Sequence, residues 1–167
     1  MSIKRKLRIY LDTSVISMID APHLPDWEAV TKEFFRVMRE QPDEFEVVVS
    51  PVALEEVRKA PEVVSDRSLA LLQSIRANEV PKHEEAETLA QLYAEANVLS
   101  DKHMNDLRHV AYAVSERCHY VVSWNMKHLV RVWTMDRVNA VNFENQYPMI
   151  QIVTPESFTG DLRHAEI

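Results

Sequence analysis

The sequence predicts an α/β fold in which a parallel β-sheet is sandwiched between helices in three layers. Four short apolar runs, rich in β-branched and aromatic residues, have the length of buried strands. They are residues 7–11, 46–50, 120–123 and 149–153. Segments with helical periodicity separate them, and strands that alternate with helices favour a parallel sheet covered on both faces.

The first predicted strand, Leu7–Leu11, ends directly before Asp12. Ligands of open α/β sheets bind at the carboxyl ends of the strands, so Asp12 is a candidate site residue. Thr13 and Ser14 can cap the helix that buries the apolar segment 15–19. The alternative is that Asp12 serves only as the N-cap of that helix, because acids often precede helices.

The remaining elements follow from apolar periodicity and from prolines. Pro51 suits the first turn of a helix. Helices are predicted over residues 27–39, 51–60, 62–76, 84–96, 102–117 and 130–143, with a last turn from Pro155. The 167 residues fit one domain, 1–167, with a helical insertion at about 62–97 beside the sheet.

The composition excludes several classes of protein. Hydrophobic residues make up 46% and charged residues 27%, as in globular proteins, and no apolar run is long enough to cross a membrane. The one cysteine, Cys118, excludes an internal disulfide and suits a reducing compartment, so we expect a cytoplasmic protein. The single glycine, Gly160, excludes the glycine-rich loops that bind nucleotide phosphates.

The formal net charge of −7 argues against a protein that holds nucleic acid mainly by counterion release. It is compatible with an enzyme that meets phosphodiesters through a metal ion, because the ion inverts the local charge.

Three acids, Asp12, Glu56 and Asp106, fall where a parallel sheet would bring them to one edge. Like charges in a half-buried crevice are unfavourable unless a cation holds them. Carboxylate, amide and water oxygens suit Mg²⁺ or Mn²⁺, whereas Zn²⁺ prefers more nitrogen or sulfur. Asn125, at the end of the third strand, offers the amide oxygen.

Four sequence blocks resemble those of the PIN domain family in order, spacing and context. They are IYLDTSVIS, VSPVALEEV, NDLRHVAYA and VVSWNMKHL, and the resemblance extends from Ile9 through the TPE near Pro155. The SWNxKH pattern in the last block is typical of one PIN subgroup. The resemblance implies a PIN-like fold and a metal-dependent ribonuclease. Many bacterial members are toxins of VapC type, paired with an antitoxin, and relatives often form homodimers.

Carried over by position, Asp12, Glu56 and Asp106 are similar to metal-binding and catalytic acids of the family. Glu55 lies one step off the pattern, because members place the second acid six residues after the strand-ending serine. Asn125 stands where many members have a fourth Asp, so the expected site has three formal charges instead of four. Either Glu56 or Asp106 would help remove a proton from the attacking water, and Thr13 or Ser14 would bond Asp12 or the ion's water.

The segment from 123 to 142 carries a local positive charge, and Lys127, His128 and Arg131 are candidate contacts to RNA phosphates. An ordinary solvated helix face is the alternative. Four other residues are expected to pack in the interior instead of binding ligand: His109, Tyr112, Trp124 and Trp133.

Two other functions compete with a ribonuclease. An inactive PIN-like domain that binds RNA or a protein partner is favoured by Asn125. A phospho-acceptor receiver domain would also have acids at strand ends. It would need two adjacent acids after the first strand and a lysine after the last, which this sequence lacks.

Overall fold

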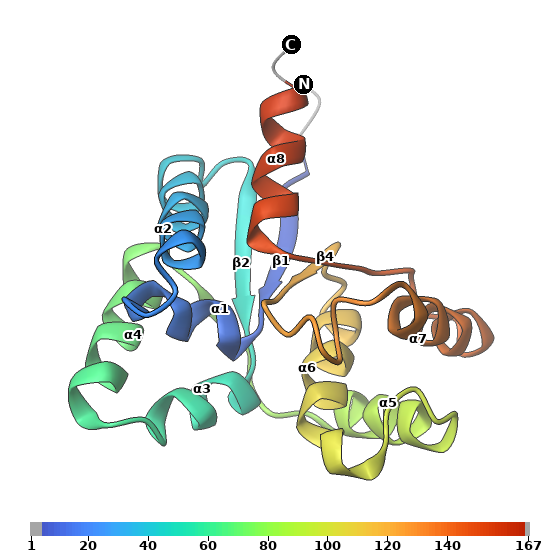
Figure 1. Ribbon diagram of the computed structural model, residues 1–167. Coiled ribbons are helices and arrows are strands. Elements are labelled where there is room, and N and C mark those ends of the chain that lie inside the picture. The colour runs from blue at the N-terminus through green and yellow to red at the C-terminus, as the bar shows by residue number, and fades with distance from the viewer. Residues whose placement is uncertain (1–4, 166–167) are drawn as a thin grey trace.

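The computed structural model describes residues 5–165 and contains one five-stranded sheet in the order β3-β2-β1-β4-β5. Its strands are β1 (Leu7–Leu11), β2 (Phe45–Val49), β3 (Asn78–Glu79), β4 (Tyr120–Val122) and β5 (Gln151–Val153). All neighbouring strands run parallel. Helices lie on both faces of the sheet, which confirms the predicted α/β three-layer fold (Figure 1). The first four and last two residues of the predicted domain, 1–167, lie outside the described residues.

The helices fall close to the segments that periodicity predicted. They are α1 (Thr13–Ser17), α2 (Pro25–Glu40), α3 (Pro51–Arg58), α4 (Glu62–Ser74), α5 (Glu84–Glu95), α6 (Met104–Ser115), α7 (Val132–Glu144) and α8 (Pro155–Ala165). Short 3₁₀ turns cover Met18–Asp20 and Asp101–His103. Among the described residues, no helix is long and apolar enough to cross a membrane.

Strand β1 lies at the centre of the sheet, where its side chains are buried on both faces. Ile9 pairs with Val47 of β2 and with Tyr120 of β4. Ile9 and Leu11 point into one hydrophobic core, whereas Tyr10 points into the other. This burial explains why Ile9, Tyr10 and Leu11 are consecutive apolar residues without polar alternation, whereas Arg8 before them is only partly buried.

Helices α1–α4 and α8 pack on one face of the sheet, and α5–α7 pack on the other (Figure 1). The segment predicted as an insertion is divided between the two layers, since α4 lies on the first face and α5 on the second. Leu89, Ala90 and Tyr93 of α5 are completely buried beside α6 and the sheet. Helix α5 therefore contributes directly to the hydrophobic core.

The prediction missed strand β3, which connects the two layers at the edge of the sheet. Its two residues, Asn78 and Glu79, are exposed and polar, and they pair with Val48 and Val49. Nothing in their sequence indicates a strand, because the pairing is made by the backbone alone.

The prediction that Trp133 is a core residue was wrong, because its side chain is 63% exposed. Helix α7 buries Thr134, Val138 and Val141, which places Trp133 on the outer face, where the Arg137 guanidinium lies 4.6 Å from its ring centroid. Tyr112 is buried as expected.

Trp124 is also buried, as expected. Its ring stacks on Trp27 at 4.6 Å, and its Nε1–H donates to Thr31 Oγ1 at 2.8 Å. With both its ring and its donor engaged in the interior, Trp124 is not available to stack on a base.

Candidate active site

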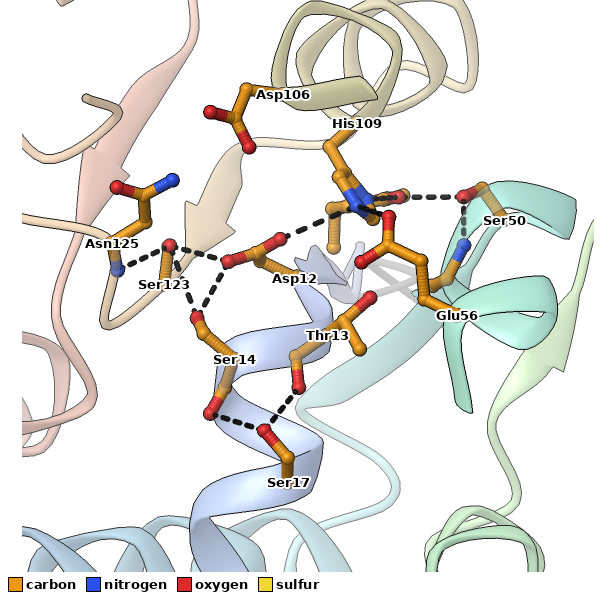
Figure 2. Close-up of polar contacts among 12 residues, drawn as sticks. Asp12, Thr13, Ser14, Ser17, Ser50, Glu56, Asp106, His109, Ser123 and Asn125 are labelled. Carbon is orange, nitrogen blue, oxygen red and sulfur yellow. Dashed lines mark hydrogen bonds and ion pairs between the residues drawn. The ribbon is translucent and has the colours of Figure 1, made fainter. Parts of the chain in front are cut away.

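The parallel sheet brings three polar residues together at the carboxyl ends of its central strands. Asp12 follows β1, Ser50 follows β2 and Ser123 follows β4. The Asp12 N–H donates to the Val122 carbonyl at 3.1 Å, so the turn after β1 is fixed against β4. Figure 2 shows these residues around one polar centre, with Glu56 of α3 and Asp106 of α6 turned toward it.

Asp12 is nearly buried, with 4% of its surface exposed. It occupies the N-cap position of α1, but its carboxylate makes no capping hydrogen bond, so it is not simply a helix cap. Instead Oδ2 accepts hydrogen bonds from the hydroxyls of Ser14 and Ser123, and Oδ1 lies 3.5 Å from His109 Nε2. The buried carboxylate is therefore held in one orientation by groups from α1, β4 and α6.

His109 connects the acids to the interior of the sheet. Its Nε2 lies 2.9 Å from Glu56 Oε1, and its Nδ1 lies 2.6 Å from the Tyr10 hydroxyl. Tyr10 in turn lies 2.6 Å from Ser50 Oγ. The expectation of a packed, hydrogen-bonded histidine is confirmed, but its partners include two of the candidate acids, so it is part of the site.

The carboxylates around His109 favour its charged form. Burial lowers the pKa of the imidazole, but Asp12, Glu56 and Asp106 outweigh burial and raise that pKa above its usual value. In the imidazolium both ring nitrogens carry a proton, and Nε2–H donates to Glu56. In the neutral ring with its proton on Nε2, that nitrogen makes the same hydrogen bond. The Tyr10 hydroxyl can accept from Nδ1 in the first case and donate to it in the second. This connection keeps the ring in place in both states.

Replacing Tyr10 by Phe should lower the free energy of unfolding by about 1–3 kcal/mol. The substitution leaves the buried His109 Nδ1 without its hydrogen-bond partner, and Ser50 Oγ keeps only the bond that it accepts from the Ala53 N–H. Urea denaturation measures the change. Tyr147→Phe is the matched control, since its hydroxyl bonds an exposed carboxylate, that of Glu85, and should change stability by less than about 0.5 kcal/mol. Equal effects of the two substitutions would show that the hydrogen bonds of Tyr10 with Ser50 and His109 do not contribute specifically to stability.

Asp106 lies at the other side of Asp12, at the start of α6. Burial and the charge of Asp12 raise the pKa of the Asp106 carboxyl, although a hydrogen bond with Asn125 and the neighbouring His109 and His128 oppose the shift. The ionised form is thus less favourable in the folded protein than in the unfolded chain. A cation bound between these acids would favour the ionised form of Asp106.

Asp106→Asn should keep or raise the melting temperature at pH 7, because it removes a charge that opposes folding. The pKa of Asp106 is higher in the folded protein than in the unfolded chain. As pH rises between these two values, ionisation of Asp106 lowers the stability of the wild-type protein, and the variant lacks this contribution. The difference should therefore shrink as pH is lowered toward 4, where the wild-type carboxyl is about half protonated in the unfolded chain. A variant that melts much lower at pH 7 would identify Asp106 as a structural residue.

The loop after β4 borders Asp106 and carries the candidate RNA contacts. The Asn125 side chain accepts a hydrogen bond from the His128 N–H at 3.0 Å, which shapes the turn. The His128 ring lies 3.9 Å from that of His103, while Lys127 and Arg131 are exposed. The three candidate RNA contacts thus lie on the Asp106 side of the centre. Burial, with the nearby His103, lowers the pKa of His128, so its ring favours the neutral form.

The structure distinguishes the two adjacent glutamates of α3. Glu56 turns toward His109, whereas Glu55 is exposed and pairs with Lys59 at 3.1 Å. The sequence pattern selected Glu56, and the structure places that residue in the polar centre.

We tested whether this centre suits a divalent metal ion. Within the described residues, no group of three or more His, Cys, Asp or Glu side chains is arranged to hold one. Mg²⁺, however, needs only one or two carboxylates when water and substrate phosphates complete its shell. Asp12 and Asp106 provide such hard oxygen donors. Among the described buried side-chain atoms, Thr13 Oγ1 is the one without a hydrogen-bond partner, and it is available to an ion's water.

Sequence reasoning missed several members of this polar centre. Tyr10 and Ser50 were assigned to a strand and its end, and His109 to the core, yet all three form one hydrogen-bonded chain. One signal was present, because His109 lies three residues after Asp106 and so shares its helix face. The Tyr10 hydroxyl, which follows Ile9 in the strand, gave no such indication.

The fold and the site define an α/β protein with an acidic centre at the carboxyl edge of its parallel sheet. The sequence matches no family model and no curated protein. The structure is similar to a chain in the crystal structure of VapBC2 from Rickettsia felis bound to a DNA fragment from their promoter. The TM-score is 0.54 with 15% sequence identity, and the match covers 89% of this chain and 98% of that chain. The similarity extends across nearly the whole fold.

Proposed function

We propose that the protein is a metal-dependent endoribonuclease of the PIN family, the toxin of a VapC-like toxin–antitoxin pair. The observation that carries this proposal is the meeting of Asp12, Glu56 and Asp106, distant in sequence, around one polar centre. The four sequence blocks and the similarity to a VapBC2 structure support the same function.

In this proposal Asp12 and Asp106 bind Mg²⁺ or Mn²⁺, with Asn125 beside Asp106. The bound ion would polarise a phosphoryl oxygen and lower the pKa of a water molecule. Ser14 and Ser123 orient Asp12 through their hydrogen bonds to it.

Glu56 is the candidate proton acceptor for the attacking water. Its carboxylate is one-third exposed, so water can reach it, and the hydrogen bond from His109 fixes its direction. Thr13 Oγ1 would orient the water. Lys127, His128 and Arg131 would hold the RNA backbone next to Asp106.

The proposed partners are an RNA substrate, a small antitoxin protein and a second copy of the chain. The homodimer is tested by light scattering, where a mass near twice 19.4 kDa is expected. A monomer at micromolar concentration would exclude it.

Induction of the protein alone in bacterial cells tests the toxin proposal. Growth should stop with the wild-type chain and continue with Asp12→Asn at equal abundance. Normal growth with abundant, folded wild-type protein would contradict a toxin.

A non-catalytic domain that binds RNA or protein is the second candidate. It is favoured by His109, which lies against Asp12 and Glu56 and balances part of their charge without a metal. Asn125, which stands in place of a fourth acid, also favours a non-catalytic domain. Protein that shifts RNA on a gel but leaves it intact with Mn²⁺ would support this function against the nuclease.

A further inference from the structure

A pocket lies beside the acidic centre, on the side opposite the loop that carries Lys127 (Figure 2). It has a volume of about 260 Å³ and lies between α3, the segment before α5, and α6. Glu56 lines it and also contacts His109, so the pocket opens next to the candidate acids. Its size is below that of drug-sized ligand sites, which begin at about 300 Å³, and suits a smaller group.

Three carboxylates and three cations line this pocket, and of the cations only Lys82 has no partner among the described residues. Arg108 pairs with Glu87 at 2.8 Å, and Lys59 pairs with Glu55 at 3.1 Å. Lys82 is exposed and has no ion-pair or hydrogen-bond partner among the described residues. Glu56, the third carboxylate of the lining, contacts His109 and not a lysine or arginine. The ammonium of Lys82 is therefore free to bind an anion, although the chain as a whole carries a charge of −7.

Arg108 is held in a fixed position at the same pocket. Its Nε–H donates to Glu87, and its Nη1 donates to Asn105 Oδ1 at 2.9 Å. These contacts orient the planar guanidinium and leave Nη2 without a hydrogen bond to the described residues. A pre-oriented guanidinium is well suited to a phosphate, because less side-chain entropy is lost on binding.

The pocket also has an apolar part. Pro51, Val52 and Tyr112 contribute to its lining. An anion that carries a ring or sugar would contact this surface with its uncharged part, while Arg108 and Lys82 bind its charge. A single nucleotide of an RNA strand has both parts.

Resting on the proposed ribonuclease function, we propose that this pocket binds the nucleotide next to the scissile phosphate of single-stranded RNA, with Lys82 and Arg108 on its phosphate. The strand then crosses the acidic centre from the Lys127 side to the Lys82 side. Single strands fit this arrangement because an unpaired nucleotide can turn into a pocket, whereas a base-paired one is held in its helix.

Binding of a fluorescein-labelled single-stranded RNA 12-mer, measured by anisotropy in Mg²⁺, tests the pocket. Asp12→Asn serves as the parent so that the RNA stays intact. Lys82→Ala and Arg108→Gln, each added to this parent, should weaken binding about five-fold, and Lys82→Ala should lower the slope of log K against log salt by about 0.7. Arg39→Ala, an exposed charge near the end of α2, is the matched control and should change neither.

The results separate this proposal from the one on which it rests. If the parent binds RNA and both pocket variants bind it equally well with the same salt slope, the pocket is not used, although the ribonuclease proposal stands. If Arg39→Ala weakens binding as much as Lys82→Ala, the attraction is general and the pocket is also excluded. Absence of RNA binding by both the parent and the wild-type protein would overturn both proposals.

Discussion

Asp12→Asn is expected to reduce RNA cleavage by about 10³-fold, equivalent to about 4 kcal/mol of transition-state stabilisation. Asp12 is the most buried of the three acids and is fixed by Ser14 and Ser123, so no neighbouring carboxylate can take its place. The amide keeps the shape and can still accept those two hydrogen bonds, but it lacks the charge that would attract the ion. Initial rates on a labelled RNA with Mn²⁺ measure the loss.

Asp66→Asn is the matched control for this substitution. Asp66 is an exposed acid on α4, outside the polar centre, and its loss changes the net charge equally. It should leave the cleavage rate within about two-fold, because surface changes away from a site have small effects. Comparable losses in the two variants would show that cleavage depends on net charge and not on the Asp12 position.

Addition of Mn²⁺ should raise the melting temperature of the metal-free protein by about 5–10 °C. An ion that binds only the folded state at about 100 times its Kd adds about 2.7 kcal/mol of stability. For a chain of this size, each kcal/mol corresponds to about 2–4 °C. The physical reason lies at Asp106. Burial and the charge of Asp12 raise the pKa of its carboxyl, and a bound cation would relieve the repulsion between the two acids.

This shift should be lost in Asp12→Asn and retained in Asp66→Asn. Differential scanning fluorimetry in the presence of EDTA, and then with excess Mn²⁺, gives the comparison without any RNA. An equal shift in all three proteins would mean that the metal binds elsewhere. No shift in the wild-type protein would favour the non-catalytic domain, in which His109 balances the acids.

The fold could be predicted because its parallel strands are buried on both faces. In the run Leu7–Leu11 only Arg8 is charged, and Ile9, Tyr10 and Leu11 are completely buried. The helices repeat apolar residues at regular spacing. Strand β3 could not be predicted, since exposed Asn78 and Glu79 join the sheet only through backbone pairing with β2. Trp133 was misplaced because its size suggested the core, whereas the buried positions of α7 are one residue away.

The candidate site was predictable at the level of its acids, because strand ends of a parallel sheet meet at one edge. Asp12 follows this rule directly. Asp106 begins helix α6 and does not end a strand, and Glu56 was distinguished from Glu55 by the resemblance to the PIN sequence blocks. The role of His109 was not predictable, because the sequence does not reveal which buried groups its two nitrogens reach. The contact with Tyr10 crosses from helix α6 to strand β1 and depends on how α6 packs against the sheet.

The central claim is that the acids around Asp12 cleave RNA by metal-assisted attack of water. The most direct test is to strip the purified protein with EDTA, add Mn²⁺ back, and analyse the ends of a labelled single-stranded RNA. The account predicts cleavage only after Mn²⁺ is restored, with linear phosphate and hydroxyl ends, because water and not the 2′-hydroxyl is the nucleophile. Intact RNA with Mn²⁺, or cleavage in EDTA that leaves 2′,3′-cyclic phosphate ends, would contradict it.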